Sequence, residues 1–468
     1  MERQVAIEKH EKIGLGEKLG YGVGDLASGL YLNFFGVFLF YYFVEIGSVA
    51  PAAIALMLLL SKLLDAVTDP MMGAIADRTR TRWGRYRPYL LFGAVPFGAF
   101  GAAVFLFPDM EPGPMLVWAY VTYGLAMLAY TAVNVPYGGL LGTISPSASE
   151  RSSVTAYRMF FSALSGIVLG LLGTTLIREL GDGDEARGIL LTMTCIAVFG
   201  TGCVWISFAT TKERIPPVES NGSIWGDVRV LVRTGPWLAV AAAAILGVLA
   251  IAARFASAKF FFKYVAGDDG APAFLFLDRL GLFLTALAVG QITGVILGNF
   301  MRNGFEKRSI IMLGGALKCG GIVLFYLLPL DAVWPQTLIQ FVIGIGFGML
   351  MVMSFSMFTD IAEYVDWKSG LQMTGLVIAA SVFAVKVGVG LGSAVPGFVM
   401  GSTGFDADAA VQSDLALTGI QLAFALIPAA ALVPAIFAVS FYSLDRKTIG
   451  QVEEELSARR GAKPVATA

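Results

Sequence analysis

Residues 62–87 read KLLDAVTDPMMGAIADRTRTRWGRYR. Asp65 and Asp69 stand four residues apart in an otherwise apolar run, so on a helix both carboxylates lie on one face. Pro70 follows directly and is expected to kink or loosen that helix, and a cluster of arginines ends the stretch. This arrangement is unusual in a soluble protein. In a membrane protein, the acids can face an internal cavity while the arginines stay in the cytoplasm.

The composition is that of a polytopic membrane protein. Of the 468 residues, 56% are hydrophobic and 14% are charged, whereas soluble domains carry about 25% charged residues. The net charge of −1 gives no electrostatic reason to expect nucleic acid as a partner. The three cysteines lie in apolar runs, and the one histidine, His10, lies in the polar N-terminal tail. Because no nucleophile–base pair or metal cluster is visible, we expect neither an enzyme nor a resident cofactor.

Apolar segments long enough to cross a bilayer follow one another along the whole chain. A membrane-spanning helix needs about 20 apolar residues, and about twelve segments of that length are present. They fall near 20–44, 51–76, 89–107, 114–142, 153–177, 188–210, 236–262, 273–300, 309–329, 333–360, 372–400 and 416–443. The sequence therefore predicts an all-α membrane protein with twelve transmembrane helices.

The longest polar interval, residues 211–235, separates six of these segments from the other six. We expect 1–210 to form an N-terminal six-helix bundle, 236–445 a C-terminal six-helix bundle, and 446–468 a tail. Most lysines and arginines fall in the loops that share a side with both termini. The positive-inside rule therefore places both termini and the 211–235 linker in the cytoplasm.

The two halves repeat weakly. Three polar landmarks recur about 225 residues apart, in corresponding spans of the two halves. The pairs are Gly73 and Gly298, Asn134 and Asp360, and Arg158 and Lys386. Repeats of this kind place a substrate site near the middle of the membrane, between the halves.

Asp65 and Asp69 are the first candidate site. Two ionised carboxylates on one face of an apolar helix repel each other, so a bound Na⁺ or a shared proton is expected to neutralise them. A hydroxyl ligand could come from Thr68 or Thr131. In the alternative interpretation, one acid pairs with Lys62 or with the basic loop as a structural latch. Ionisable residues inside a membrane are functional by default, which favours the cation site.

Four polar residues inside other spans are candidates for substrate binding: Asp25, Asn134, Arg158 and Lys386. Asp25 stands in a glycine-rich helix start, and its alternative role is that of a helix-entry residue near the membrane interface. Asn134 can hydrogen-bond a sugar hydroxyl or another helix. Arg158 and Lys386 occupy matched positions in the two halves, which favours a shared cavity role over snorkelling or simple pairing with acids. Lys318 has no evident role.

A second set of charges stands at the cytoplasmic ends of the spans. Gly73, Asp77 and Arg78 close the second span, while Asp360 and Glu363 end the tenth. A charge network in this place can latch the two bundles in one conformation, so these residues are candidates for gating. The plainer interpretation is positive-inside topology, which explains most of the neighbouring arginines.

Six stretches carry a resemblance to a known family. They are KLGYGVGD at 18–25, LLDAVTDPMMG at 63–73, RTRWGRYRPYLL at 80–91, YTAVNVP at 130–136, DIAEY at 360–364 and VFAVKVG at 382–388. In these stretches the chain resembles the glycoside–pentoside–hexuronide:cation symporters of the major facilitator superfamily, of which melibiose permease is the reference. The resemblance covers nearly the whole chain. It implies the major facilitator fold, in a monomer embedded in the lipid of a bacterial inner membrane.

The resemblance also implies roles for individual residues. Asp65, Asp69 and Thr131 fall on cation-binding positions of the family, which take Na⁺ as the metal ion where coupling is to sodium. Thr68 falls where the melibiose carrier has asparagine. Lys386 falls on the lysine of the eleventh helix.

The chain departs from that reference at the sugar site. The sugar-binding aspartate of the first helix aligns with Gly29, one turn after Asp25. The fourth-helix aspartate aligns with Asn134, and the tryptophan that stacks on the galactosyl ring aligns with Gly138. Arg158 is one residue out of register with the family arginine in an ungapped alignment. We therefore expect the cation site to be kept and the galactoside site to be rebuilt.

These observations together predict cation-coupled symport of a sugar or glycoside by alternating access, with Na⁺ or H⁺ as the coupling ion. One alternative is a lysolipid-type carrier on the same fold, which a wide apolar groove lined by Phe34, Phe35, Phe38 and Phe40 would favour. Another is a non-transporting membrane sensor or a channel. The repeat symmetry and the paired acids argue against a channel, which would need rings of charge across subunits.

Overall fold

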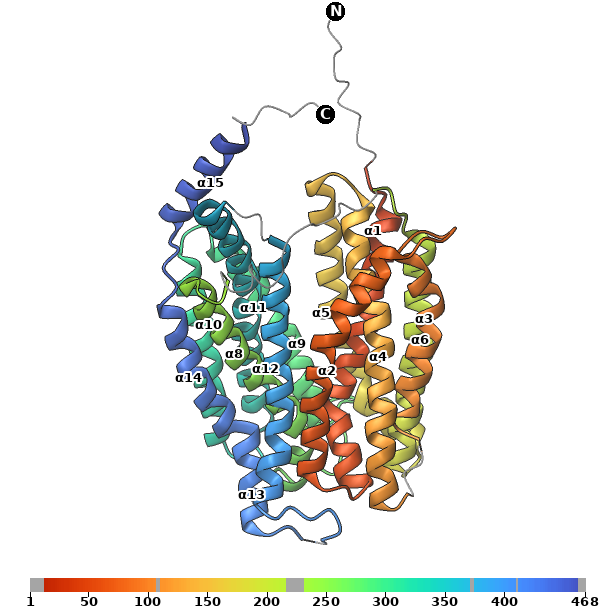
Figure 1. Cartoon of the computed structure of the whole chain (residues 1–468). Coiled ribbons are helices and arrows are strands. Elements are labelled where there is room, and N and C mark those ends of the chain that lie inside the picture. The colour runs from red at the N-terminus through yellow and green to blue at the C-terminus, as the bar shows by residue number, and fades with distance from the viewer. Residues whose placement is uncertain (1–11, 107–109, 216–230, 371–373, 410, 462–468) are drawn as a thin grey trace, which may run out of the picture. The chain divides into compact units, whose positions relative to one another are not determined.

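The computed structural model describes residues 12–106, 110–215, 231–370, 374–409 and 411–461, and these ranges are helical apart from short connections (Figure 1). The first half contains α1 (Leu15–Phe34), η1 (Phe35–Leu39), η2 (Tyr42–Ile46), α2 (Pro51–Arg78), α3 (Arg87–Ala103), α4 (Pro112–Ile144), α5 (Ala148–Gly181) and α6 (Glu185–Thr210). The elements η1 and η2 are π-helical turns that continue α1.

The second half repeats this arrangement of long helices. It contains α8 (Gly235–Phe260), η3 (Phe261–Val265), α9 (Arg279–Met301), α10 (Lys307–Leu327), α11 (Val333–Ser369), α12 (Thr374–Ser402), α13 (Asp414–Gln421), η4 (Leu422–Leu426), α14 (Ile427–Ser440) and α15 (Arg446–Gly461). The elements α13, η4 and α14 form one continuous run that is 27 residues long from Asp414 to Ser440.

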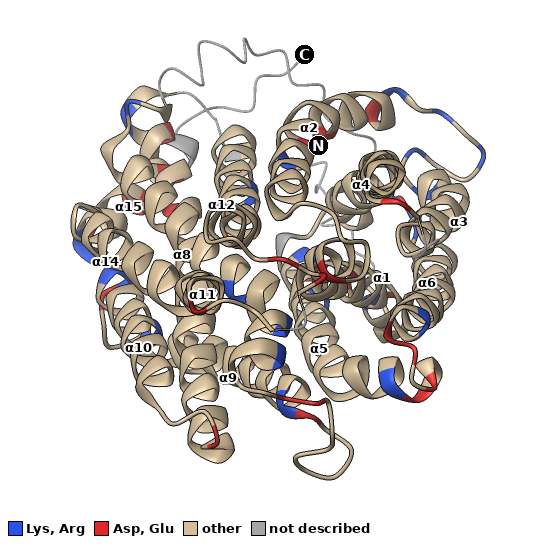
Figure 2. Ribbon diagram, turned by 90° about the horizontal axis from the view of Figure 1, so that it is seen from below, with Lys and Arg blue, Asp and Glu red and all other residues tan. Residues whose placement is uncertain are grey.

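Eleven helical runs in the described ranges are long and apolar enough to cross a membrane. They correspond to eleven of the twelve predicted spans, and the remaining one, near 89–107, is α3 with 17 residues. Seen from below, the ribbon of the helices is mostly free of charged residues, which gather in loops and at helix ends (Figure 2). The all-α fold predicted from the sequence is confirmed, and the chain is a multi-pass membrane protein.

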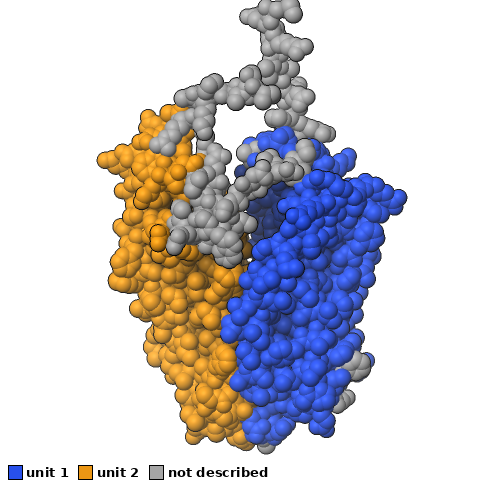
Figure 3. All heavy atoms as spheres, in the orientation of Figure 1, with its two compact units in different colours: residues 1–220, 270–285, 406–409 blue, residues 221–269, 286–405, 410–468 orange. Residues whose placement is uncertain are grey.

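The chain divides into two compact units (Figure 3). Unit 1 comprises Met1–Ser220, Gly270–Thr285 and Asp406–Ala409; unit 2 comprises Asn221–Asp269, Ala286–Phe405 and Ala410–Ala468. The division at residue 220 falls inside the polar interval 211–235. Two short segments from the second half belong to unit 1, so the units are not simply the two halves of the sequence.

Glycines bring α1 close to three other helices of unit 1. A methyl group added at any of three alternate positions would lie under 3.0 Å from a side chain of another helix: Gly20 against Thr210 of α6, Gly22 against Phe161 of α5, and Gly24 against Tyr137 of α4. The glycine-rich start of α1 therefore serves close packing. It places the next residue, Asp25, among α4, α5 and α6.

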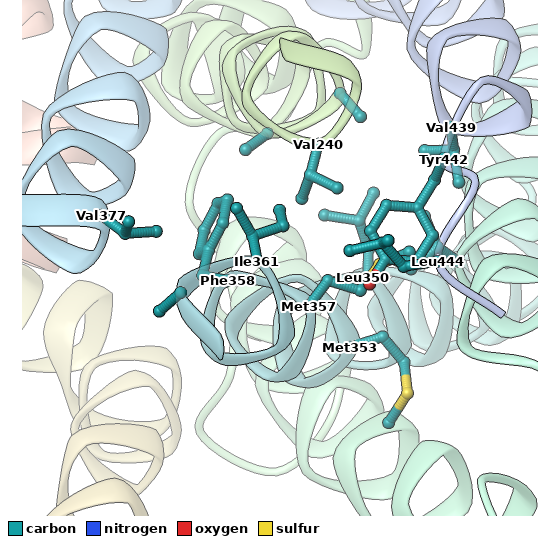
Figure 4. Packing of buried hydrophobic residues seen from close by; sticks show 14 of the residues in the cluster. Val240, Leu350, Met353, Met357, Phe358, Ile361, Val377, Val439, Tyr442 and Leu444 are labelled. Carbon is teal, nitrogen blue, oxygen red and sulfur yellow. The ribbon is translucent and has the colours of Figure 1, made fainter. Parts of the chain in front are cut away.

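Unit 2 is built around an apolar core to which the helices α8, α10, α11, α12 and α14 and the segment after α14 contribute (Figure 4). Val240 comes from α8, Met353 and Phe358 from α11, and Tyr442 and Leu444 from the segment after α14. All of them are at most 5% exposed. Tyr442 and Leu444, which follow α14, are therefore part of the packed core of this unit.

Candidate functional site

The pair Asp25–Arg158 joins α1 to α5 inside unit 1. The Arg158 Nε lies 3.1 Å from the Asp25 Oδ1, and the two side chains are 28% and 13% exposed respectively. The sequence analysis placed both residues in the substrate site, and the structure brings them into contact. A carboxylate and a guanidinium held together offer hydrogen-bond acceptors and donors side by side.

Asn134 lies on α4, and its amide nitrogen donates to the hydroxyl of Tyr130 on the same helix. The charges of Asp25, Arg158, Asp65 and Asp69 all reach that hydroxyl. Tyr130 therefore lies within electrostatic range of both the Asp25–Arg158 pair and the two acids of α2. Tyr130 had no role in the sequence analysis, because a tyrosine in an apolar helix is usually a packing residue.

Asp65 is bound by a lysine of its own helix. The Lys62 Nζ lies 2.9 Å from the Asp65 Oδ2, and Asp65 is only 2% exposed. This is the structural pairing that the sequence analysis held as the alternative to a cation site. The charges of Asp65 and Asp69 both act on Lys62, so the ammonium lies where a coupling cation would be attracted.

Asp69 is bound by a hydroxyl from a different helix. The Thr131 hydroxyl on α4 donates to the Asp69 Oδ1 at 3.0 Å. The Thr68 hydroxyl instead donates to the Leu64 carbonyl of its own helix at 3.1 Å. Of the two hydroxyls that could accompany the acids, Thr131 contacts one of them, and it ties α2 to α4.

The residues around Asp69 fit a monovalent cation better than a transition metal. Among the described residues, no group of three or more His, Cys, Asp or Glu comes together. The two carboxylates of Asp65 and Asp69 and the ammonium of Lys62 together have a formal charge of −1. One Na⁺ or one proton would balance that charge, and carboxylate and hydroxyl oxygens are suitable ligands for a hard cation.

Gly29 and Gly138 have opposite surroundings. A Cβ built at Gly29 would lie 2.2 Å from the Ser165 Oγ of α5. A side chain at that position therefore meets Ser165, and the acid that α1 carries, Asp25, stands one turn earlier. A Cβ built at Gly138 would meet no atom within 4 Å, so the space next to it on α4 is open.

The four phenylalanines whose lining of a wide apolar groove would favour the lysolipid alternative are buried. Phe34, Phe35, Phe38 and Phe40 are at most 6% exposed. Phe34 and Phe35 pack against the ring of Phe105, with centroids 5.6 and 5.9 Å away. These rings form packing contacts inside unit 1, so they do not supply the open groove that would favour the lysolipid alternative.

The predicted gating residues at the end of α2 lie at the surface of unit 1. Gly73 is half-buried, and Asp77 and Arg78 are exposed. The Tyr86 hydroxyl donates to the Asp77 Oδ1 at 2.6 Å. Burial, together with the hydrogen bond to Asp77, raises the pKa of Tyr86 to about 12.

The candidate residues of the second half lie in unit 2. Lys386 is half-buried on α12, and Glu363 is half-buried on α11. Asp360, also on α11, is held from two sides: the Lys307 ammonium lies 2.8 and 2.7 Å from its two oxygens, and the Tyr442 hydroxyl donates to it at 3.3 Å. Both partners of Asp360 belong to the same unit.

Glu213 belongs to the polar interval 211–235 and binds the start of α3. Its carboxylate accepts hydrogen bonds of 2.8 to 3.1 Å from the backbone N–H groups of Arg85, Tyr86 and Arg87, where α3 begins. A distant side chain thus caps this helix. The sequence signal was weak, because a single glutamate in a polar segment does not identify a partner 126 to 128 residues away.

Comparisons with known proteins agree with this architecture. The sequence profile of the family described as "MFS/sugar transport protein" matches residues 20–446. The chain is 28% identical to the inner membrane symporter YicJ of Escherichia coli strain K12 over 450 residues, which cover 96% of each chain. It is 29% identical to the isoprimeverose transporter of Lactiplantibacillus pentosus, covering 94% of this chain and 91% of that protein.

Solved structures share the fold at low sequence identity. The crystal structure of a D-xylose-proton symporter matches with a TM-score of 0.66 and 13% identity, covering 92% of this chain and 98% of that one. A bacterial homologue of the lysosomal transporter Spinster matches with a TM-score of 0.67 and 13% identity, covering 93% and 98%. The chain therefore belongs to the MFS/sugar transport protein family as a secondary transporter of the major facilitator superfamily, and its resemblance to the glycoside–pentoside–hexuronide:cation symporters is confirmed.

Proposed function

We propose that this transporter couples the uptake of a sugar or glycoside to the entry of one Na⁺ or H⁺ by alternating access. It acts in the plasma membrane of a bacterium with both termini in the cytoplasm, as the distribution of basic residues favours. The observation that carries the proposal is that unit 1 holds both an acid–arginine pair, Asp25 with Arg158, and an acid pair on α2, of which Asp69 is bound by Thr131 of α4. A relative described as a "Putative glycoside/cation symporter" supports the substrate class.

The sugar binds at Asp25, Arg158 and Asn134. The Asp25 carboxylate accepts hydrogen bonds from neighbouring hydroxyls of the sugar, and the Arg158 guanidinium donates to the same hydroxyls. Asn134 both donates and accepts. The open space next to Gly138 admits a substituent that a bulky side chain at this position would exclude, so the pocket suits a different or larger glycoside than an α-galactoside.

The coupling cation binds at Asp65 and Asp69, with the Thr131 hydroxyl as a further ligand. Lys62 occupies the Asp65 carboxylate, so an entering cation competes with, or displaces, this ammonium. Thr131 and Asn134 stand three residues apart on α4. Binding of the cation therefore acts on the helix that carries part of the sugar site, and sugar raises cation affinity by the same factor.

Uptake of a panel of labelled sugars into vesicles containing the purified protein tests coupling. We expect a Na⁺ or proton gradient to drive accumulation in the wild type. Asp65→Asn and Asp69→Asn are expected to abolish the stimulation by the gradient while the protein stays folded. Glu179→Gln, at an acid whose side chain is 66% exposed, is the matched control. Gradient-driven uptake that persists in both Asp variants would overturn the cation site.

Direct binding of an α-galactoside, several glucosides and several xylosides tests the sugar site. We expect glucosides or xylosides to bind more tightly than the galactoside, and Asp25→Ala to lose that binding. Tight α-galactoside binding that survives Asp25→Ala would contradict both the altered specificity and the role of Asp25.

A further inference from the structure

Tyr21 of α1 and Tyr137 of α4 form a reciprocal pair next to the proposed sugar site. The Tyr21 hydroxyl donates to the Tyr137 backbone carbonyl at 2.9 Å, and the Tyr137 hydroxyl donates to the Tyr21 carbonyl at 2.5 Å. The two rings are stacked, with centroids 4.5 Å apart and an angle of 10° between planes. Two hydrogen bonds and one stacking contact thus fix both rings in position.

The surroundings leave the Tyr137 ring little freedom. Tyr21 is 0% and Tyr137 is 3% exposed. A methyl group at Gly24 would lie 2.7 Å from the Tyr137 ring, so α1 carries a glycine where that ring passes. The ring therefore rests directly on the backbone of α1, one residue before Asp25.

Arg158 lies over this fixed ring. The centre of its guanidinium is 5.2 Å from the Tyr137 ring centroid, within the range of a cation–π contact. The Nε of the same guanidinium lies 3.1 Å from Asp25. An arginine side chain has several rotatable bonds, and a contact with a rigid ring restricts the orientations from which it can reach the carboxylate.

We propose that Tyr137 is a positioning residue of the substrate site. Its ring, fixed to α1 by the exchange of hydrogen bonds with Tyr21, holds the Arg158 guanidinium against Asp25, so that both charged groups are presented together to the hydroxyls of the sugar. This inference rests on the proposed sugar site at Asp25 and Arg158. Tyr137 itself acts through Arg158 and makes no hydrogen bond to the sugar.

Three variants separate the ring from its hydroxyl and from ordinary packing. Tyr137→Phe keeps the ring and loses the hydroxyl with its hydrogen bonds, whereas Tyr137→Leu loses the ring. Tyr120→Leu is the matched control, because Tyr120 lies on the same helix and its hydroxyl also donates to a carbonyl of another helix, that of Ala53 at 3.1 Å. Tyr137→Met has a longer and more flexible side chain than leucine and no aromatic face. It replaces Tyr137→Leu if the leucine variant cannot be purified in folded form.

The first measurement needs no sugar. The purified full-length protein is treated with phenylglyoxal, and modification of Arg158 is compared by mass spectrometry with that of Arg178, whose side chain is 33% exposed. We expect Tyr137→Leu to raise the modification of Arg158 about fivefold, while Tyr137→Phe and Tyr120→Leu leave it near the wild-type level. An unchanged ratio in Tyr137→Leu would overturn the positioning role.

The second measurement is the kinetics of uptake for the best substrate of the sugar panel. Tyr137→Leu is expected to raise KM about tenfold with little change in the maximal rate, and Tyr137→Phe to restore most of the affinity. An equal rise of KM in Tyr120→Leu would reduce Tyr137 to a packing residue and contradict the proposal. If the wild type transports none of these sugars, the proposed function fails, while the reactivity of Arg158 still decides the role of Tyr137.

Discussion

The two units hold the loop between their second and third helices in opposite ways. In unit 1, the segment after α6 supplies Glu213, whose carboxylate binds backbone N–H groups of residues 85–87. In unit 2, the segment after α14 supplies Arg446, whose guanidinium binds the carbonyls of Arg302, Asn303 and Phe305. We call residues 212–215 the first clasp and residues 442–446 the second clasp. The position in each unit is the same, while the charge of the binding group is reversed.

The charge of the binding group is reversed because the first clasp binds the N-terminus of a helix and the second clasp lies at a helix C-terminus. Glu213 faces the first N–H groups of α3, which have no partner inside their own helix and attract an anion. Arg446 faces the carbonyls of residues just after the end of α9, where the negative end of the helix favours a cation. The first clasp also reaches α1 and α4: the Arg214 guanidinium binds Glu17 at 2.8 and 2.9 Å, and its backbone N–H donates to the Thr143 carbonyl at 2.8 Å.

The clasps also differ in exposure. Glu213 is half-buried, whereas all three hydrogen bonds of the Arg446 guanidinium are exposed. Water can replace an exposed partner but cannot easily reach a buried one, so the first clasp should contribute more to stability. Substitutions in the first clasp should therefore lower the free energy of unfolding more than substitutions in the second clasp.

Removal of the Glu213 carboxylate should have the largest effect. Glu213→Ala leaves three backbone N–H groups at the start of α3 without their acceptor, which we expect to lower the free energy of unfolding by about 2–3 kcal/mol. Thermal unfolding in detergent measures the loss, and hydrogen exchange of residues 85–87 locates it. Glu213→Gln keeps one acceptor oxygen and should lose less than half as much. Unchanged exchange in Glu213→Ala would mean that the carboxylate does not cap α3.

Two glycines test the comparison at matched loops. Gly84 has a φ of 110°, and a Cβ added there would lie 2.6 Å from the Glu213 carboxylate. A Cβ added at Gly304 would meet no atom within 4 Å. Gly84→Ala should therefore cost about 1–3 kcal/mol through strain and displacement of the clasp. Gly304→Ala, in the corresponding loop of unit 2, should change stability by less than about 0.5 kcal/mol. Equal changes in melting temperature would show that the two loops are not held differently.

Arg446→Ala should have a smaller effect than Glu213→Ala. It removes the hydrogen bonds to the three loop carbonyls, but water can satisfy them, so we expect a loss of about 0.5–1 kcal/mol. Hydrogen exchange of residues 302–306 and thermal unfolding measure it. Arg446→Lys keeps the charge but not the fork of donors, so it should recover only part of the loss. A loss as large as that of Glu213→Ala would remove the proposed difference between the clasps.

The sequence predicted the fold because its signals are local and repeated. Each apolar segment of about 20 residues predicts a membrane-spanning helix by itself. Eleven of the twelve predicted segments are long helical runs in the described ranges. The spacing of Asp65 and Asp69 likewise predicts a shared helix face. The contact of Asp25 with Arg158 joins two spans, and the sequence suggested it only because both residues are charged in apolar surroundings.

The first clasp and the contact between Tyr21 and Tyr137 could not be predicted from such local patterns. Glu213 binds backbone groups, and a backbone N–H has no residue type that a sequence could reveal. Tyr21 and Tyr137 also bind each other's backbone carbonyls. The pairing of Lys62 with Asp65 was weighed as an alternative, because a lysine three residues before an acid can reach it on one helix. Contacts from side chain to distant backbone depend on helix packing, which local patterns do not describe.

The smallest effect concerns a tyrosine that each unit places against an aspartate. In unit 1 the Tyr86 hydroxyl donates to Asp77 at 2.6 Å, and in unit 2 the Tyr442 hydroxyl donates to Asp360 at 3.3 Å. Burial, followed by the charge of the aspartate or its hydrogen bond, raises the pKa of both hydroxyls, that of Tyr86 to about 12. The protonated hydroxyl is thus favoured in the folded protein.

A hydroxyl whose pKa is raised on folding contributes stability below the pKa of the unfolded chain, which for tyrosine is about 10. That contribution is lost as the pH rises from about 10 through 12. Tyr86→Phe should therefore cost about 1 kcal/mol or less at neutral pH, and its difference from the wild type should shrink above pH 10. The stability difference between Tyr442→Phe and the wild type should persist to higher pH, because Tyr442 is the more deeply buried residue, at 3% against 7% exposed for Tyr86. Unfolding midpoints measured in steps from neutral to alkaline pH give both differences. A Tyr86→Phe difference that stays constant through this range would mean that Asp77 and burial do not hold the proton on Tyr86.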